Sequence, residues 1–266
     1  MARDEIDIKV RDLVMRYGAN TVLKDVNLDI CSGCVTCILG PSGCGKSTLL
    51  KAMLGLVTPS AGYVRMLGRD VTGMEREELS SFLTRVGVTF QHGALFGSET
   101  IGDNVATPLR VHTRLDEDTI WSIVEVKLAQ VGLEEAIYSY PSELSGGMQK
   151  RAALARALAL DPRILLFDEP SAGLDPETAD DLDELILQLN QTLGATFVIV
   201  THEIRSALRI SDRIVFLSEG DVQVSGTVED FLESSNENAR RFMAASDFHT
   251  ATEKPAREGV RDDNPT

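Results

Sequence analysis

The sequence predicts an α/β fold, and three observations lead to that class. A β-branched and apolar run, Val35–Leu39, passes through a glycine-rich turn into the helical pattern of residues 49–54. A second apolar run at residues 164–167 ends in Asp168-Glu169. Between the two runs the pattern changes to helix from about residue 101 to residue 160. Strands that alternate with helices are typical of α/β proteins, so the helical stretch is predicted to be an insert in such a fold.

The glycine-rich turn has the spacing of a phosphate-binding loop and reads Gly40-Pro41-Ser42-Gly43-Cys44-Gly45-Lys46-Ser47-Thr48. Its glycines let the backbone bend so that N–H groups converge on anionic oxygens, and the following helix adds the positive end of its dipole. Lys46 supplies a charge for the outer phosphates, and the Ser47 hydroxyl can complete the coordination of magnesium. The sequence therefore predicts that the chain binds a nucleoside triphosphate; the alternative is a glycine-rich turn that binds nothing.

The N-terminal part of the chain predicts strands. Residues 6–10 carry an apolar side chain at every second position, and residues 22–30 contain a similar run. We predict a turn at residues 15–20 between them. This places Tyr17 just ahead of the strand that leads into the phosphate loop, where it can either stack on a nucleotide base or pack as an ordinary aromatic side chain.

A strand–helix–strand segment is predicted after the first helix. We expect a short edge strand at residues 62–68, a helix at residues 75–83 and a strand at residues 86–90. Gln91 follows the last of these strands directly. Because ligands of doubly wound sheets bind at the carboxyl ends of strands, Gln91 is a candidate site residue.

The second half of the chain predicts helices, a strand and a hairpin. The apolar residues of 115–131 recur at three- and four-residue spacing, which predicts an amphipathic helix, and residues 152–160 predict another. A strand is expected at residues 196–200 and a hairpin at residues 213–224. Residues 247–266 are dominated by polar and charged types, so we predict a disordered tail.

The predicted helix at residues 178–193 is rich in acidic residues near its start. Its inner face is expected to consist of Leu182, Leu185, Ile186 and Leu189. Its early acidic cluster consists of Glu177, Asp180, Asp181, Asp183 and Glu184. They could form a cation site, but a helix N-terminus favours negative charge in any case, so we predict a solvated acidic face.

Composition and charge restrict the function further. The chain is 43% hydrophobic and 25% charged, as is usual for a soluble globular protein, and no apolar run approaches the length of a membrane span. The first residues lack the apolar core of a secretory signal. The net charge of −15 argues against a nucleic-acid partner and against electrostatic adhesion to an anionic membrane. We therefore expect a cytoplasmic protein, and if it works at a membrane, another protein must hold it there.

Four cysteines lie close together in the sequence, at Cys31, Cys34, Cys37 and Cys44. Such spacings can indicate a zinc or iron–sulfur site. However, Cys37 lies within a predicted strand and Cys44 within the phosphate loop, and alternation along the strand would separate their side chains. We predict small buried or loop cysteines and no metal cluster.

Two carboxylates follow the apolar run at residues 164–167 and have a chemical role downstream of a phosphate loop. Asp168 can hold magnesium directly or through water, and Glu169 can polarise a water molecule for attack on the terminal phosphate. Carboxylates at a strand end also occur as plain caps, so the pair gains weight only in combination with other motifs.

The segment Leu144-Ser145-Gly146-Gly147-Met148-Gln149 resembles the signature of the ATP-binding-cassette (ABC) ATPases, and the other motifs follow in that family's order. The resemblance implies a P-loop ABC nucleotide-binding domain at residues 1–246, with a RecA-like core, an antiparallel β subdomain and a helical subdomain at about residues 97–160. It implies nucleotide contacts from Tyr17, Gly40, Pro41, Ser42, Gly43, Cys44, Gly45, Lys46, Ser47, Thr48, Ser145, Gly146 and Gly147. It implies Glu169 as general base with His202, Gln91 and Lys46 in catalysis, and magnesium on Ser47, Gln91 and Asp168.

The same resemblance implies partners. In the family, the signature reaches the terminal phosphate on the opposite subunit, so two copies would sandwich two ATP molecules head to tail. The run Gln91-His92-Gly93-Ala94-Leu95-Phe96 offers apolar residues where the family contacts its membrane subunit. The chain looks most like the ATPases of Mla-type transporters, which move phospholipid with MCE-class proteins. This implies a peripheral location on the cytoplasmic face of the inner membrane and a separate permease.

Two alternatives remain open from the residues. One is the ATPase of an importer for amino acids or other polar solutes, because nothing in this chain touches the transported substrate. The other is a regulatory or assembly ABC ATPase without a permease. The apolar residues at 94–96 favour a membrane partner if they are exposed, and ordinary core packing if they are buried.

Overall fold

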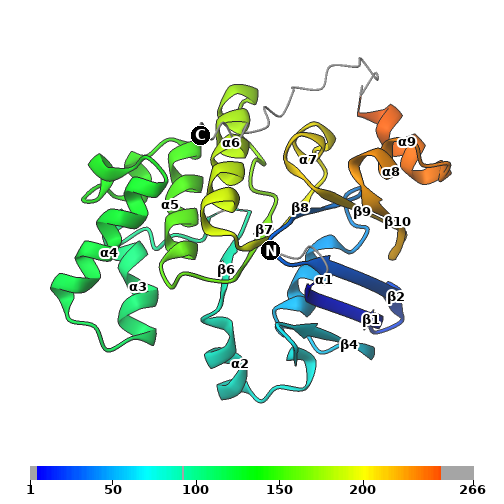
Figure 1. Ribbon diagram of the computed structural model, residues 1–266, viewed down its shortest axis with the longest axis horizontal. Helices are drawn as coiled ribbons and strands as arrows, with labels where there is room; N and C mark the ends of the chain where they lie inside the picture. The colour runs from blue at the N-terminus through cyan, green and yellow to red at the C-terminus, as the bar shows by residue number, and fades with distance from the viewer. Residues whose placement is uncertain (1–4, 92, 247–266) are drawn as a thin grey trace, which may run out of the picture.

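The structure is a computed structural model that describes residues 5–91 and 93–246, and it contains two β-sheets with helices around them (Figure 1). The strands are β1 Ile6–Tyr17, β2 Asn20–Cys31, β3 Val35–Leu39, β4 Ala61–Met66, β5 Arg69–Asp70, β6 Val86–Thr89, β7 Ile164–Asp168, β8 Thr196–Thr201, β9 Arg213–Ser218 and β10 Asp221–Thr227. The α-helices are α1 Lys46–Met53, α2 Arg76–Leu83, α3 Ile101–His112, α4 Glu117–Gln130, α5 Gly146–Leu158, α6 Pro176–Leu193, α7 Ile204–Ile210, α8 Val228–Leu232 and α9 Glu237–Ala245. Short 3₁₀ turns occupy Val71–Gly73, Glu134–Ala136 and Pro141–Glu143.

The six-stranded sheet forms the centre of the molecule. Its order is β10-β9-β3-β8-β7-β6, and all strands except β10 run parallel. Parallel strands need crossover connections, and the helices that supply them cover both faces of the sheet. The predicted α/β class is therefore confirmed, and the predicted hairpin is β9–β10.

Alternation along the central strands divides the core into two layers. In β3, Cys37 and Leu39 pack with α5, α6 and α7, whereas Ile38 packs with α1 and the second sheet. The strands β7, β8 and β9 alternate in the same way. Successive side chains of a strand point to opposite faces, so one short apolar strand serves both layers. Cys37 and Cys44 consequently belong to different core layers, as the strand pattern predicts.

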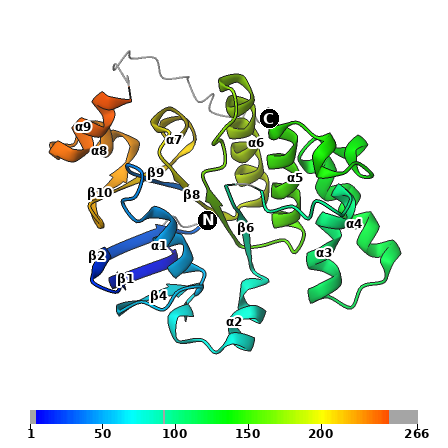
Figure 2. The same cartoon turned by 180° about the vertical axis from the view of Figure 1, so that it is seen from behind.

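The second sheet is antiparallel, in the order β2-β1-β4-β5, and it lies beside α1 (Figure 2). The predicted turn at residues 15–20 is wrong at its start, because β1 continues to Tyr17 and only Gly18 and Ala19 separate it from β2. Asp12 adopts a φ of 49° and shifts the register, so that Leu13 and Met15 are buried beyond the bulge. That shift hides the alternation of this strand in the sequence.

Helices α3, α4 and α5 form one end of the molecule, and the antiparallel sheet lies toward the other (Figures 1 and 2). Their apolar faces join the same core layer as α6 and α7. The helix predicted at residues 152–160 begins earlier, at Gly146, because the Ser145 side chain caps it by accepting a hydrogen bond from Met148 N.

The acidic face predicted on α6 is only partly solvated. Its apolar inner face is as predicted, but Asp183 is 1% exposed and accepts hydrogen bonds from Ser206 and Arg209 of α7. Asp183 lies three residues before Ile186 of the inner face, and residues at this spacing lie on the same side of a helix, so Asp183 faces the packed side. The prediction of a solvated side chain is wrong at this position.

Three expectations from the sequence concern a membrane span, a metal site and the C-terminal tail. Across residues 5–91 and 93–246, no helix combines the length and hydropathy needed to cross a membrane. Cys31, Cys37 and Cys44 carry free thiols, and no group of three or more His, Cys, Asp or Glu residues is arranged to hold a metal within these same ranges. The predicted tail at residues 247–266 and His92 lie outside the described residues.

Candidate active site

The candidate site lies at the carboxyl edge of the central sheet, where the parallel strands β3, β7 and β8 end together. Leu39 of β3 pairs with Thr201 of β8, and Asp168 of β7 pairs with Val200. The phosphate loop leaves β3 at this edge, Glu169 follows β7, and His202 follows β8. Parallel pairing thus brings together three segments that are far apart in the sequence.

The phosphate loop needs glycine at two positions, at one because of close packing and at the other because of the backbone conformation. A Cβ on Gly40 would lie 2.1 Å from the carbonyl oxygen of Leu217, so no other residue fits beside β9. Gly45 adopts a φ of 111° directly before α1, a conformation that L side chains rarely adopt. The loop therefore wraps closely around the N-terminus of α1, where unpaired N–H groups favour anions.

Lys46 is buried within this loop. Its ammonium donates to the carbonyl oxygens of Gly40 at 2.8 Å and Pro41 at 3.1 Å. Its Nζ also lies 3.9 Å from Glu169 Oε1. A cation of this kind, on a flexible stem and held by two carbonyls and one carboxylate, can turn toward a phosphate.

Ser47 and Asp168 supply oxygen donors beside the loop. Ser47 Oγ donates to Asp168 Oδ1 at 3.2 Å. Burial raises the pKa of Asp168, although the hydrogen bond from Ser47 opposes this shift. Magnesium prefers oxygen ligands and usually takes one or two from the protein and others from phosphates and water. The hydroxyl and carboxylate fit that requirement.

Glu169 and His202 form a direct pair. His202 Nδ1 lies 2.9 Å from Glu169 Oε2, and His202 N donates to the same oxygen at 3.3 Å. Glu169 has a φ of 51°, which is unusual for a residue with a side chain, and its N–H donates to Val200 O at 2.8 Å. The carboxylate is therefore held in one orientation, with its second oxygen directed toward Lys46.

The side chains of Tyr17 and Gln91 are both exposed. Tyr17 is 50% exposed at the end of β1, so core packing does not explain its side chain. Gln91 is exposed just after β6, and its carbonyl oxygen accepts a hydrogen bond from Lys150 of α5. The structure does not bring either side chain into hydrogen-bond contact with Lys46, Asp168 or Glu169 among the described residues. Their roles stay predictions.

The segment Ser145-Gly146-Gly147 lies at the start of α5, in the helical end of the molecule (Figure 2). A Cβ on Gly147 would come 2.4 Å from Thr178 of α6, so this glycine permits close helix packing. Unpaired N–H groups at this helix N-terminus favour an anion, as do those at the start of α1.

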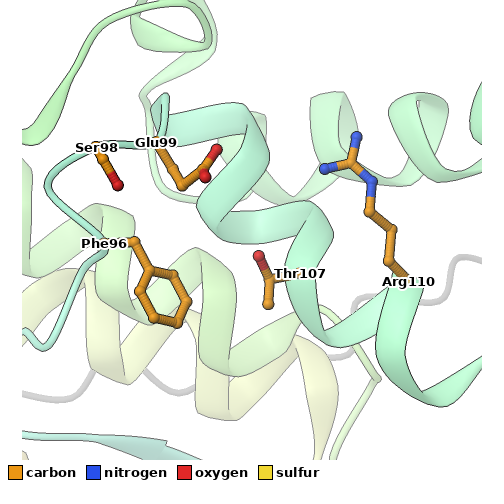
Figure 3. A pocket seen from close by; sticks show the side chains of 5 residues that line it. All are labelled: Phe96, Ser98, Glu99, Thr107 and Arg110. Atoms are coloured by element: carbon orange, nitrogen blue, oxygen red, sulfur yellow. The ribbon is translucent and has the colours of Figure 1, made fainter.

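An open pocket lies between the loop before α3 and α3 itself (Figure 3). It is lined by Phe96, Ser98, Glu99, Thr107 and Arg110. Phe96 is 51% exposed, and Figure 3 shows its ring on the side of the pocket that Thr107 faces. The sequence left open whether residues 94–96 are exposed or buried. In the structure, Leu95 packs against the core, whereas Ala94 and Phe96 face solvent.

Residues 23–172 match the family described as ABC transporter. The chain belongs to the ABC transporter family. It is an ABC ATPase, and the matched region contains the phosphate loop, the 144–149 signature and the Asp168-Glu169 pair.

The relatives of this ABC ATPase support the Mla-type resemblance. It is 40% identical to the intermembrane phospholipid transport system ATP-binding protein MlaF of Haemophilus influenzae, over 96% of this chain and 97% of that protein. The MlaF protein of Escherichia coli K12 is 39% identical over 89% of this chain and 88% of its own length. A probable ribonucleotide transport ATP-binding protein, mkl of Mycobacterium leprae, is 43% identical over 90% of this chain and 69% of that protein.

Solved structures confirm the fold of the ABC ATPase. A dimeric ATP-binding cassette in a post-hydrolysis state, with ADP and phosphate bound, superposes with a TM-score of 0.76 and 33% identity over 83% of this chain and 98% of that one. The cbiO1 protein of Clostridium perfringens, part of the cbiONQ transporter complex, superposes with a TM-score of 0.80 and 29% identity over 91% of this chain and 96% of that one.

The contacts of two cations with the segment after β6 were not predicted from the sequence. Lys150 and Arg156 of α5 donate to carbonyl oxygens of the segment after β6, at Gln91, Gly93 and Ala94. Their only signal in the sequence is that they are charges in a helix whose other residues near Arg156 are mostly alanine and leucine. Sequence alone does not say which segment such a helix packs against.

Proposed function

We propose that this ABC ATPase is the ATP-hydrolysing subunit of a phospholipid transporter. The observation that carries the proposal is its match to MlaF proteins along almost the whole of both chains, combined with the cluster of Lys46, Ser47, Asp168, Glu169 and His202 at one sheet edge. The match supports the cargo class, and the cluster supports the chemistry.

The proposed binding of ATP uses the phosphate loop and its neighbours. The loop amides and Lys46 hold the phosphates, and the exposed ring of Tyr17 stacks on the base. Ser47, Asp168 and Gln91 would hold magnesium, which when bound neutralises charge on the phosphate oxygens. Asp168 and Ser47 already lie 3.2 Å apart, so little rearrangement is needed.

Hydrolysis is proposed to proceed with Glu169 as general base. The oxygen of a water molecule attacks the terminal phosphorus while Glu169 accepts its proton, and the bond to the ADP oxygen breaks. His202 orients the Glu169 carboxylate through the 2.9 Å contact and can bond the departing phosphate. Lys46 stabilises the charge that develops on the phosphate oxygens.

A second copy is proposed to complete the site. The Ser145-Gly146-Gly147 amides lie at the helical end of the molecule, away from the phosphate loop beside α1 (Figure 1). A head-to-tail pair places the signature of each copy on the ATP of the other, with two-fold symmetry. The dimeric relative with ADP and phosphate supports this arrangement.

The remaining proposed partners belong to the membrane side. The pocket at Phe96 offers a partly apolar surface for a separate permease, and an MCE-type lipid-binding protein would belong to the same complex. The protein would then sit peripherally on the cytoplasmic face of the inner membrane. The net charge of −15 argues against a nucleic-acid partner.

One relative's name suggests a different cargo. The mkl protein is called a probable ribonucleotide transport ATP-binding protein. A ribonucleotide is polar, and the sequence left open an importer ATPase for amino acids or other polar solutes. The phospholipid proposal is preferred because this chain spans 97% of the H. influenzae MlaF protein but only 69% of mkl.

Affinity purification of the tagged, full-length protein from its own cell membranes tests the proposal. We expect a permease and an MCE-type protein to co-purify, and bound lipid extracted from the complex to be phospholipid. A periplasmic receptor for a polar solute in place of the MCE-type protein would contradict the cargo class. Recovery of the protein without any membrane subunit would contradict the transporter role.

A further inference from the structure

Helix α5 holds the segment after β6 by its backbone. Arg156 donates from Nη1 to Ala94 O and from Nη2 to Gly93 O, both at 2.8 Å. Its guanidinium carbon also lies 5.9 Å from the centre of the Phe96 ring. Six residues earlier on α5, Lys150 donates to Gln91 O. Two side chains of one helix therefore contact the segment from Gln91 to Phe96 at four of its residues.

These two cations have no carboxylate partner within hydrogen-bonding distance in the described part of the chain. Burial lowers the pKa of both Lys150 and Arg156. A partly buried cation loses part of its hydration unless hydrogen-bond acceptors replace it, and here the acceptors are the carbonyls of the segment. If the segment moves, α5 must therefore follow it or lose those bonds.

The segment itself has the shape that this contact requires. Gly93 and Ala94 both adopt left-handed conformations, with φ of 69° and 51°. Ala94 carries a side chain, for which this conformation is unfavourable in isolation. The consecutive left-handed residues direct both carbonyls to the same guanidinium, and planar Arg with two parallel donors matches such a pair better than Lys would.

We propose that Arg156 is a positioning residue that transmits displacement of Phe96 to the signature at the start of α5. The inference rests on the proposed function, in which Phe96 contacts a permease and Ser145-Gly146-Gly147 contact ATP on a second copy. Arg156 lies about 15 Å along the helix from Gly146, and a packed helix moves as a rigid element over that length. Docking at Phe96 then displaces the signature, and with it the contact to the ATP of the second copy, through the bonds that Arg156 makes.

Hydrogen–deuterium exchange on the isolated full-length protein tests the local part of this proposal. The amides of Gly93 and Phe96 are the reporters, because they donate to Phe90 O and to Asn104 Oδ1, each at 2.8 Å. Arg156→Gln should raise their exchange at least tenfold. Arg151→Gln is the matched control, since Arg151 lies on the same helix and donates to Val131 instead. Unchanged exchange in Arg156→Gln would overturn the proposal.

ATP hydrolysis by the complex purified from membranes tests the transmission. Arg156→Gln should leave hydrolysis by the isolated protein within twofold of the parent, and should reduce the stimulation by the bound permease at least fivefold. The double variant Phe96→Ala/Arg156→Gln should be no worse than either single variant, because both changes break one route. A merely structural role would instead lower the basal rate as well, with additive effects.

The two possible failures are distinguishable. If no membrane subunit co-purifies with the parent protein, the proposed function fails and the transmission fails with it. If the permease co-purifies in equal amounts with parent and Arg156→Gln protein and both are stimulated equally, the inference about Arg156 alone is overturned.

Discussion

At the scale of the residue, Glu169 combines the properties that a general base for water attack requires. Its side chain is only 12% exposed, and one oxygen is fixed by the His202 ring and backbone N–H. The left-handed backbone at this position costs about 1 kcal/mol, so the surrounding bonds must hold it there. Strain of this kind at a sheet edge, beside a phosphate loop, is what a site that fixes one carboxylate would contain.

Glu169→Gln preserves the size and the hydrogen bonds of this side chain but removes its ability to accept a proton. We expect ATP hydrolysis to fall by about 10²-fold or more while ATP binding persists, so that an ATP-bound dimer accumulates. Hydrolysis assays and size-exclusion chromatography with ATP measure both effects. Glu203→Gln is the control, because Glu203 contacts His202 from the exposed side at 3.4 Å. A Glu169→Gln protein that hydrolyses ATP at the parental rate would refute the assignment.

The sequence predicts individual site residues well where a motif is local. Lys46 and Ser47 were predicted because the spacing of a phosphate loop fixes their geometry within nine consecutive residues. Arg156 and Asp183 were not predicted as contacts, because their partners depend on which distant segment packs against each helix. The burial of a single charge is a tertiary property, and helical periodicity places Asp183 only approximately.

At the scale of the element, α6 and α7 are joined by one ionic cluster. Asp183 accepts hydrogen bonds from Ser206 Oγ at 2.8 Å and from Arg209 Nη2 at 3.1 Å. Arg209 also pairs with Asp180 Oδ1 at 2.9 Å and donates to the Asp180 carbonyl at 2.7 Å. Because α7 begins two residues after His202, this cluster also fixes the position of the histidine.

Arg209→Ala should lower the free energy of unfolding by about 2–3 kcal/mol, because it leaves the buried Asp183 carboxylate without its cation. Asp180→Ala removes a partner that is 56% exposed, and should change the same quantity by no more than about 1 kcal/mol. Urea unfolding of both variants measures the difference. Equal losses in the two variants would show that the buried pair contributes nothing beyond a surface contact.

The N-terminus of α3 predicts a pH dependence of stability. Hydrogen bonds from Thr100 and Arg110 lower the pKa of Asp103. A carboxylate whose folded pKa is depressed contributes stability above its unfolded pKa of about 3.9 and loses that contribution as pH falls through the folded value. Between about pH 5 and pH 2, the unfolding free energy of the parent should therefore fall more than that of Asp103→Asn, by about 0.5–1 kcal/mol. Parallel urea titrations that show the same acid slope in both proteins would contradict this.

Elements were predictable where one pattern dominates. The buried strands β3, β7 and β8 and the amphipathic helices α4 and α6 follow directly from apolar runs and from three- and four-residue spacing. The second half of β1 was missed because the bulge at Asp12 shifts the alternation by one residue. Pairing with β2 and β4 on both sides overrides that local irregularity.

At the scale of the whole molecule, the phosphate loop and the signature lie in different parts of one protein. The phosphate loop lies beside α1 and the antiparallel sheet, whereas the signature lies at the start of α5 among the helices (Figures 1 and 2). We expect the two features to act on the same ATP only when they come from different copies.

Mixing two inactive variants tests that claim most directly. Lys46→Ala disables the phosphate loop, and Ser145→Arg disables the signature, so each variant alone should be inactive. In a mixed pair, one site combines both defects and the other combines an intact loop with an intact signature. We predict that an equimolar mixture regains ATP hydrolysis, up to about a quarter of the parental rate if half of the pairs are mixed and the sites act independently. A protein carrying both substitutions, mixed with either single variant, should remain inactive. A mixture of the two single variants that stays at background would contradict the shared site.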